Sequence, residues 1–326
     1  MYKNDLIKFS DIVRAKNTIK NYIVNTPLIY DHYLSNKFEA KIFYKAESIQ
    51  RTGSFKIRGA FNKIYQSINS DDTSGVLAWS SGNHAQGVAE AAKIFKIKAT
   101  IVMPKDAPKI KIQGTKSRGA NIIFYNRKTE NREEIGRSIA ENKNLIIIPP
   151  YDDKNVIAGQ GTIGLEIIDQ IKGYGLKPDK VLVPTGGGGL ISGISIILKN
   201  KYKDINLYAV EPNKFSDYSK SLKYKKVFKN NMNNYSICDS LLANMPGKIT
   251  FDINKNLLKR GLTVNDNQVL NAIKYAYQNL GLILEPGGAV ALAAILNKKT
   301  EVKNKTLIAV LSGSNIDPKI FKKAIT

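Results

Sequence analysis

Short apolar runs rich in β-branched residues recur along the chain, and Gly, Pro or Ser bound them. Runs of this length that are apolar without alternation are typical of strands buried on both faces of a mainly parallel sheet. The expected strands are residues 75–80, 99–104, 120–125, 144–150, 180–185, 205–212 and 307–312.

Segments with the helical spacing of apolar residues lie between these runs. The alternation of strands and helices predicts a doubly wound α/β fold, in which ligands bind beyond the C-terminal ends of the strands. The turns that follow the strands are therefore where we look for chemistry. The expected helices are residues 83–97, 132–142, 161–171, 266–280 and 288–298.

Composition narrows the class of protein. The 326 residues are 43% hydrophobic, and no run of 18 apolar residues occurs, so the sequence predicts a globular protein without a membrane span. The N-terminus lacks the apolar core of a secretory signal. The single cysteine, Cys238, cannot form an internal disulfide. We therefore expect a cytoplasmic protein.

The chain is strongly basic, with a formal net charge of +23. Binding to nucleic acid or to an anionic membrane is one interpretation, and a lysine-rich composition is the other. Only eight of the 50 basic residues are Arg, the residue that base and phosphate recognition favours, and the lysines are spread along the whole chain. We expect no nucleic-acid and no membrane partner.

The turn at residues 79–84 reads Trp-Ser-Ser-Gly-Asn-His and joins an expected strand to an expected helix. Backbone N–H groups at a helix start are free to bind an anion such as a carboxylate. An ordinary helix cap is the alternative. Two hydroxyls, an amide and one of only two histidines within six residues favour a binding site.

The turn at residues 184–190 reads Pro-Thr-Gly-Gly-Gly-Gly-Leu. Four glycines let the backbone wrap around a tetrahedral anion, most simply a phosphate. The loop also comes close to a dinucleotide-binding fingerprint, with Ser192 where the last glycine would stand and Glu211 at the spacing of the ribose-binding acid. A nicotinamide oxidoreductase is therefore an alternative that the loop alone leaves open.

Lys56, in "RTGSFKIRGAF" (51–61), stands next to Phe55 and among small residues. Desolvation lowers the pKa of a lysine amine and makes it a nucleophile. A phosphate loop, a carboxylate turn and a reactive amine together call for a ligand with a phosphate at one end and an aldehyde that lysine can bind. That ligand is pyridoxal 5′-phosphate, and the substrate would be an amino acid.

These motifs resemble those of the fold-type II pyridoxal-phosphate enzymes, in the threonine dehydratase and serine racemase group. The resemblance covers nearly the whole chain. It rests on "NTPL" (25–28), "SFKIRGA" (54–60), "SSGNHAQGVA" (80–89), "MPKDAPKIK" (103–111), "PPYDDKNVIAGQGTIGLEI" (149–167), "GGGGLISG" (186–193), "EPGGAVALAA" (285–294) and "LSGSNID" (311–317).

The resemblance implies a fold like that of tryptophan synthase β, with two doubly wound sheet domains and the cofactor between them. Residues 1–74 and 151–326 would form the large cofactor-binding domain, and residues 75–150 a small mobile domain. It also implies a homodimer or a homotetramer.

The resemblance further assigns roles to the polar residues of the turns. Lys56 would hold the cofactor covalently and move protons at the substrate Cα. Ser312 would face the pyridine nitrogen, where a neutral hydroxyl makes the ring a weaker electron sink than a carboxylate would. The other expected contacts are Phe55 on the ring, Asn83 at the phenolic oxygen, Gly186, Gly187, Gly188 and Gly189 at the phosphate, and Ser80, Ser81, Asn83 and His84 at the substrate carboxylate.

Glu211 and Asp217, with the carbonyl of Phe215, resemble the divalent-cation site found in part of this group. Oxygen ligands of this kind suit Mg²⁺ or Ca²⁺. Two surface acids in a loop are the alternative interpretation.

Members of the group differ in substrate. "PPYDD" (149–153) looks like a threonine/serine dehydratase, and with the sequence ending at residue 326 we expect a form without the feedback domain of isoleucine-regulated members. Ser81 is similar to serine racemases, whose hydroxyl protonates the opposite face of Cα, although the turn could simply require a small residue. Ser314 and the segment 236–247 depart from the commoner dehydratase pattern.

Arg132 aligns with an arginine of serine racemase-like and 3-hydroxyaspartate dehydratase-like members that can meet a second carboxylate. A surface arginine paired with Glu133 or Glu134 is the alternative. The resemblance thus implies an ammonia-lyase that converts a β-hydroxy amino acid, L-threonine or L-serine first, to a 2-keto acid. A 3-hydroxyaspartate dehydratase and a serine racemase with side dehydratase activity stay open.

Overall fold

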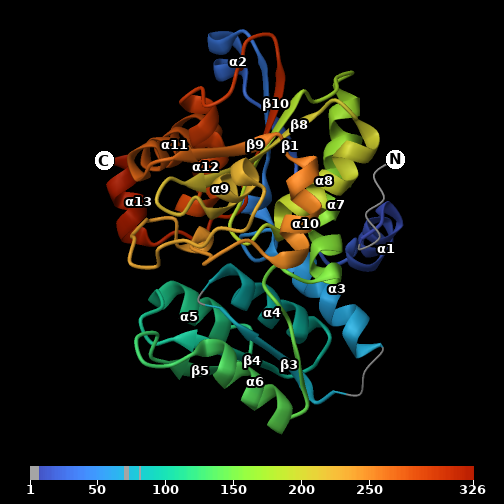
Figure 1. The fold of residues 1–326 in the computed structure, drawn as a ribbon, viewed down its shortest axis with the longest axis vertical. Coiled ribbons are helices and arrows are strands. Elements are labelled where there is room, and N and C mark those ends of the chain that lie inside the picture. Colours follow the sequence, from blue (N-terminus) through green and yellow to red (C-terminus); the bar gives the residue numbers. More distant parts are fainter. Residues whose placement is uncertain (1–6, 70–72, 81) are drawn as a thin grey trace.

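The structure is a computed structural model of the chain, and it describes residues 7–69, 73–80 and 82–326. Ser81, one of the expected substrate contacts, lies outside the described residues. Two sheets with helices packed on them make up the molecule, as Figure 1 shows. This architecture confirms the predicted α/β class.

The larger sheet has six strands in the order β1-β2-β10-β7-β8-β9. Strand β1 pairs antiparallel with β2, and the other neighbours pair parallel. Its central strands are apolar and buried along their whole length, as a parallel sheet covered on both faces requires. The strands are β1 (Leu28–Tyr30), β2 (Lys41–Lys45), β7 (Lys180–Pro184), β8 (Asn206–Pro212), β9 (Arg260–Val264) and β10 (Thr306–Val310).

The smaller sheet has four parallel strands in the order β5-β4-β3-β6 and lies in the lower half of Figure 1. Strands β3 and β4 are fully buried, because helices cover both of their faces. The strands are β3 (Gly75–Trp79), β4 (Ala99–Pro104), β5 (Asn121–Tyr125) and β6 (Leu145–Ile147).

Helices cover the faces of both sheets. One long helix, α7, packs against α1, α3 and α8, while α11 packs against α12 and α13. No helix among the described residues is long and apolar enough to cross a membrane. The helices are α1 (Phe9–Ile19), α2 (His32–Phe38), α3 (Lys56–Ile68), α4 (Asn83–Ile94), α5 (Lys109–Lys116), α6 (Arg132–Asn142), α7 (Lys154–Gly173), α8 (Gly189–Lys201), α9 (Asp217–Tyr224), α10 (Lys248–Leu257), α11 (Asp266–Leu280), α12 (Pro286–Leu296) and α13 (Pro318–Ile325), with short 3₁₀ turns η1 (Glu47–Ile49) and η2 (Asp239–Leu241).

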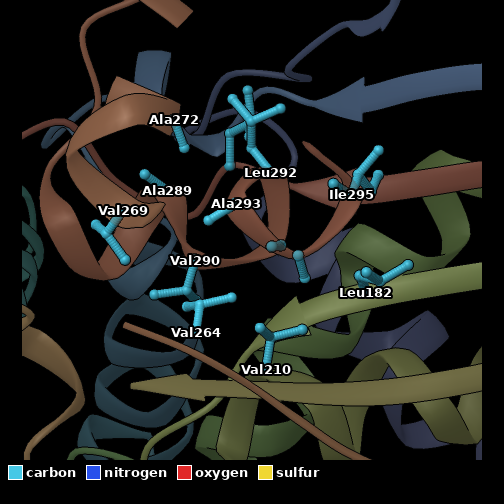
Figure 2. Close-up of a cluster of buried hydrophobic side chains, with 14 of the residues drawn as sticks. Leu182, Val210, Val264, Val269, Ala272, Ala289, Val290, Leu292, Ala293 and Ile295 are labelled. Carbon is cyan, nitrogen blue, oxygen red and sulfur yellow. The ribbon is translucent and has the colours of Figure 1, made fainter. Parts of the chain in front are cut away.

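Apolar side chains from α11 and α12 fill the space above β7, β8 and β9, and Figure 2 shows part of this cluster. Val290 of α12 lies close to Val264 of β9 and Val210 of β8 in that view. Helix α12 is apolar all round and buried throughout, so it forms the centre of the helical layer. The helix begins at Pro286, so Glu285 is the residue that caps its N-terminal end.

Helix α3 connects the two halves. Its residues Ile57, Phe61 and Ile64 join the apolar cluster of the smaller sheet, while the other side of the helix packs on α7 of the larger half. Residue Lys56 begins this helix, so the amine that the sequence singles out lies where the two halves meet.

Candidate active site

A pocket at the C-terminal ends of β3, β7 and β10 collects the expected polar residues from both halves. These are the strand ends at which doubly wound folds bind ligands. The pocket is lined by Phe55, Lys56, Ser80, Asn83 and His84, by all four glycines of the loop at 186–189, and by Arg132 and Ser312. The structure thus brings the two turns and Lys56, which are remote in sequence, to one cavity.

Backbone contacts bring Lys56 to the end of β10. Ser54 and Gly313 form a short antiparallel bridge, and the N–H of Phe55 donates to the carbonyl of Ser312 at 3.2 Å. The Lys56 side chain then turns into the pocket, where its Nζ donates to the carbonyl of Pro150 at 2.6 Å and lies 5.2 Å from the centre of the Phe55 ring.

Burial lowers the pKa of Lys56 to about 8, and Glu285 acts in the opposite direction. A protonated amine loses solvation in the pocket, and one carboxylate compensates for only part of that loss. Near neutral pH both forms of the amine are therefore populated. Such an amine can act as a nucleophile and can take up or release a proton.

A buried ion cluster fixes helix α3 two residues after Lys56. The guanidinium of Arg58 contacts Glu47 at 2.8 Å and Glu166 at 2.6 Å, and the ammonium of Lys45 contacts Glu166 at 2.6 Å. Removing one partner from such a cluster leaves a buried unpaired charge and costs roughly 3–5 kcal/mol. The cluster thus holds the start of α3 in place.

The glycine loop between β7 and α8 has the shape of an anion site. Residue Gly188 has a φ of 95°, and a Cβ there would lie 2.5 Å from the hydroxyl of Tyr218. At Gly187 a Cβ would lie 2.4 Å from the ring of Tyr151. Only glycine therefore permits this path of the chain.

The backbone of the glycine loop leaves N–H groups without acceptors among the described residues, while one of its carbonyls is bonded. The carbonyl of Gly187 accepts from the hydroxyl of Thr250 at 2.6 Å and from the N–H of Gly247 at 3.1 Å. The N–H groups of Gly186, Gly187 and Gly188 donate to no other group in the part of the chain that the structure describes. Helix α8 begins at the next residue and adds its own free N–H groups. This arrangement fits a phosphate.

The polar turn after β3 also ends at a helix start. The hydroxyl of Ser80 accepts from the N–H of Gly82 at 3.2 Å, and α4 begins at Asn83. Its first N–H groups have no partner within the helix and can bind a carboxylate.

His84 lines the pocket, and its side chain bonds to the backbone. Its Nε2 lies 2.8 Å from the carbonyl of Ile148, so this nitrogen carries the hydrogen. Burial and the nearby Lys56 lower the pKa of His84 to about 3. The ring is therefore neutral, and its Nε2 is bonded to a backbone carbonyl. The group that His84 can offer to an anion is its backbone N–H.

Arg132 begins α6 and lines the same pocket. The nearby Glu134 accepts from Asn131 at 2.8 Å, and Arg132 forms no ion pair with any described residue. Arg132 is exposed, as the surface alternative expects, but the structure shows no ion pair between it and Glu133 or Glu134. A free guanidinium at the pocket can bind a carboxylate in a fork geometry.

The structure adds pocket residues that the sequence reasoning did not single out. Lys111 of α5 reaches Asp239 of η2 at 2.5 Å and comes within 3.9 Å of Glu285. Burial works against charge on Lys111, but Glu285 and Asp239 together raise its pKa. Tyr151 packs on the glycine loop. Lys111, Tyr151 and Glu285 all stand inside motifs that carry the resemblance, which was the one available signal.

The expected cation ligands lie around the start of helix α9, of which Asp217 is the first residue. Both carboxylate oxygens of Glu211 accept hydrogen bonds from backbone N–H groups in the first turn of α9. The distances are 2.8 Å from the N–H of Tyr218 and 2.7 Å from that of Ser219. The Oδ2 atom of Asp217 is buried without a hydrogen bond. Among the described residues, no group of three or more His, Cys, Asp or Glu side chains could hold a metal ion. The buried Oδ2 of Asp217 is therefore the one observation at this place that favours a cation.

The chain is similar to a known protein family over most of its length. The family model described as "Pyridoxal-phosphate dependent enzyme" matches residues 19–313. The L-threo-3-hydroxyaspartate ammonia-lyase of Saccharomyces cerevisiae is 36% identical over 98% of this chain and 96% of its own length. The L-threonine ammonia-lyase of Thermotoga maritima is 38% identical over 98% of this chain and 78% of its own length.

Among solved structures, maize serine racemase superposes with a TM-score of 0.90 at 32% identity, covering 98% of this chain and 97% of that chain. The family match decides between the two ligands that the glycine loop left open, and it favours pyridoxal phosphate over a nicotinamide dinucleotide. The fold and the pocket fit this cofactor: a glycine cradle for its phosphate faces an amine that can bind its aldehyde.

Proposed function

The chain belongs to the family of pyridoxal-phosphate-dependent enzymes, and we propose that it is an ammonia-lyase that dehydrates a β-hydroxy amino acid, with L-threonine or L-serine as the first candidate substrates. The observation that carries this proposal is the position of Lys56: its amine, with a pKa of about 8, lies in one pocket with the glycine loop and the carboxylate turn. Relatives named for ammonia-lyase activity, at 36% and 38% identity, support it.

Each pocket residue has a role in this proposal. The loop at 186–189 binds the phosphate of the cofactor, Ser312 faces its pyridine nitrogen, Phe55 packs on its ring, and Asn83 contacts its phenolic oxygen. The N–H groups that begin α4, with Ser80 and Ser81, bind the substrate carboxylate. When bound, pyridoxal phosphate supplies a ring that withdraws electrons from the substrate Cα.

Lys56 is the proton carrier of the reaction. Its neutral amine takes the proton from Cα, and the bond from Cβ to the hydroxyl then breaks. The hydroxyl takes up one proton as it leaves, so that H⁺ from Cα and OH⁻ from Cβ together account for one water. The enamine product exchanges its nitrogen for the oxygen of another water outside the enzyme. The net products are a 2-keto acid and ammonia: 2-oxobutanoate from threonine and pyruvate from serine. A Lys56→Ala variant that kept normal turnover would overturn this mechanism.

A second candidate substrate, 3-hydroxyaspartate, is favoured by one observation. The guanidinium of Arg132 lines the pocket without an ion-pair partner among the residues described, and a threonine methyl group offers it no partner either. A second substrate carboxylate would. Serine racemisation, with Lys56 and Ser81 on the two faces of Cα, is the other alternative, and chiral analysis of the remaining serine tests it.

The deciding measurement is kcat/KM for ammonia release with L-threonine, L-serine and the stereoisomers of 3-hydroxyaspartate. A tenfold preference, about 1.4 kcal/mol in transition-state binding, assigns the substrate. If threonine wins, the enzyme is a threonine dehydratase and Arg132 has no substrate partner. If 3-hydroxyaspartate wins, Arg132 reads the second carboxylate. If none of these releases ammonia, the proposed activity fails.

We also propose a divalent cation, Mg²⁺ or Ca²⁺, at Glu211, Asp217 and the carbonyl of Phe215. The buried Oδ2 of Asp217, which lacks a hydrogen bond, supports it. Thermal unfolding in chelator and then in excess Mg²⁺ tests the site, because a bound ion raises the unfolding temperature. An unchanged temperature in wild type and in Asp217→Asn contradicts it.

Three broader features complete the proposal. Residues 75–150 carry their own sheet and apolar cluster, which supports a small domain that moves on residues 1–74 and 151–326. The family resemblance supports a homodimer or homotetramer, to be checked by light scattering. The single cysteine supports a cytoplasmic location, to be checked by fractionation.

A further inference from the structure

The side-chain amide of Asn83 is held at both ends. Its Oδ1 accepts from the Nδ2 of Asn315 at 2.8 Å, and its Nδ2 donates to the Oε1 of Glu285. Asn83 is 5% exposed and lines the pocket. Its two partners come from different elements, since Glu285 precedes α12 and Asn315 follows β10.

The orientation of this amide follows from a backbone carbonyl. The Nδ2 of Asn315 donates to the carbonyl of Thr52 at 2.9 Å, and because a carbonyl only accepts, the NH₂ group of Asn315 must be on this side. Its second hydrogen then meets the Oδ1 of Asn83. The NH₂ group of Asn83 must therefore face Glu285, whose carboxylate only accepts when ionised.

Glu285 is itself tightly fixed. Its N–H donates to the carbonyl of Gly313 at 3.0 Å, and a Cβ at Gly313 would lie 2.5 Å from its Oε1. The side chain is 1% exposed. A free-moving carboxylate could not hold the Asn83 amide in one place, whereas this one can.

Groups around Glu285 balance its charge incompletely. Lys111 lies 3.9 Å from its Oε2, which accepts no hydrogen bond from the described residues, and Lys111 is itself paired with Asp239 at 2.5 Å. Lys56 also acts on Glu285 through its charge. Burial raises the pKa of Glu285 to about 7, with Lys111 opposing the shift.

We infer that Glu285 and Asn315 are positioning residues, which orient the Asn83 amide so that its remaining N–H is available to the cofactor's phenolic oxygen. An amide NH₂ group has two hydrogens, and Glu285 uses one of them. Without these two partners, the amide could rotate and present its oxygen, which would repel a phenolate. This inference rests on the contact between Asn83 and the cofactor proposed above.

A double-mutant cycle on cofactor affinity tests the inference. The apoprotein is titrated with pyridoxal 5′-phosphate, and Kd is measured for wild type, Asn83→Ala, Glu285→Gln, Asn315→Ala and the two double variants with Asn83→Ala. Each single change is expected to raise Kd about tenfold, the order expected for one charge-assisted or buried hydrogen bond. In the Asn83→Ala background, Glu285→Gln and Asn315→Ala are expected to change Kd less than twofold.

Two controls separate positioning from folding. Glu90→Gln removes another carboxylate on α4, one that pairs with Arg51 and Arg118, and should leave Kd unchanged. The visible absorption band of the bound cofactor should shift in Glu285→Gln and Asn315→Ala as it does in Asn83→Ala. If Glu285→Gln does not fold, as judged by thermal unfolding, Asn315→Ala decides alone.

The outcomes distinguish this inference from the proposed function. If Glu285→Gln and Asn315→Ala raise Kd as much in the Asn83→Ala background as in wild type, they do not act through Asn83 and the inference is wrong, while the proposed function stands. If Asn83→Ala leaves both Kd and the absorption band unchanged, Asn83 does not contact the cofactor, and that part of the proposed function fails together with the inference.

Discussion

Two strand-to-helix turns line the pocket, and they differ in what they offer a ligand. The turn after β7 consists of glycines, has no side chain to offer, and is fixed by Tyr151, Tyr218 and Thr250 around it. The turn after β3 carries Ser80 and Asn83, whose side chains take part in hydrogen bonds of their own. Both end at helix starts with free N–H groups.

The two turns suit two kinds of ligand: a cofactor phosphate that is the same in every turnover, and a substrate whose functional groups can vary. A glycine cradle is defined by the path of the backbone, so it suits a phosphate that is the same in every turnover. A turn with side chains, together with Arg132 on the same half of the molecule, can distinguish substrates by their second functional group. Changes at the two turns should therefore affect different measured quantities.

The largest effect is expected at the cradle. Gly188→Ala places a side chain at a φ of 95° and 2.5 Å from the Tyr218 hydroxyl; strain of about 1–3 kcal/mol and the overlap should weaken pyridoxal-phosphate binding by roughly 100-fold. Titration of the apoprotein measures this. Gly175→Ala is the matched control, because its φ is 67° and nothing lies within 4 Å, and its cofactor affinity should match wild type. Equal losses in both variants would mean that backbone strain alone acts.

Arg132 on the smaller-sheet half should change substrate choice. Arg132→Leu removes a charge-assisted hydrogen bond of roughly 1.5–3 kcal/mol, so kcat/KM for L-threo-3-hydroxyaspartate should fall about 10- to 100-fold while that for threonine stays within about threefold. Arg127→Leu, which removes an exposed arginine paired with Asp106, should change neither. A parallel fall for both substrates would contradict a role in selectivity.

Lys56 lies between the two turns, and its pKa predicts a pH dependence. Only the neutral amine attacks an aldehyde, so the rate at which apoprotein captures pyridoxal phosphate should rise about tenfold per pH unit up to about pH 8 and then level off. Stopped-flow absorbance measures this rate. Free lysine, as the control, should keep rising toward pH 10. A protein profile that follows free lysine would show that the pocket does not desolvate Lys56.

The smallest effect is expected at Ser80. Ser80→Ala removes the hydrogen bond to the N–H of Gly82, worth about 1 kcal/mol, so KM for the amino acid should rise about fivefold with cofactor affinity unchanged. Ser117→Ala removes a comparable local hydrogen bond to Gly114 on α5 and should leave KM unchanged. A change in cofactor affinity instead of KM would contradict the separate roles of the two turns, with the cofactor bound after β7 and the substrate after β3.

The apolar pattern predicted the most deeply buried strands and several helices, but it missed strands at or near the edges of the larger sheet. All seven expected strands occur, as β3 to β8 and β10, and so do the five expected helices. Strands β1, β2 and β9 were missed. They lie at or near the edges of the larger sheet, and their apolar runs are short: β1 has three residues, β2 has Ile-Phe-Tyr between two lysines, and β9 is partly exposed. An edge strand has fewer buried neighbours, so its sequence is less constrained.

The candidate site divides in the same way. The glycine loop, Lys56 and the polar turn could be predicted, because no other residue types give the same backbone path or the same chemistry. The partners of Glu285 could not. Its contacts with Asn83, 202 positions away in sequence, and with Lys111 exist only because two sheets meet at one pocket.

The sequence by itself determined the α/β class, the positions of seven buried strands along the chain, the family and the amine expected at the centre of the chemistry, since short-range patterns and motifs carry these. Only the tertiary structure decided that Arg132 is free of an ion pair, that the His84 ring is turned to Ile148, and that Asn83 is held by Glu285 and Asn315. The physical reason is that hydrogen bonds and charges act over a few ångströms in space, and folding alone decides which distant residues come within that range.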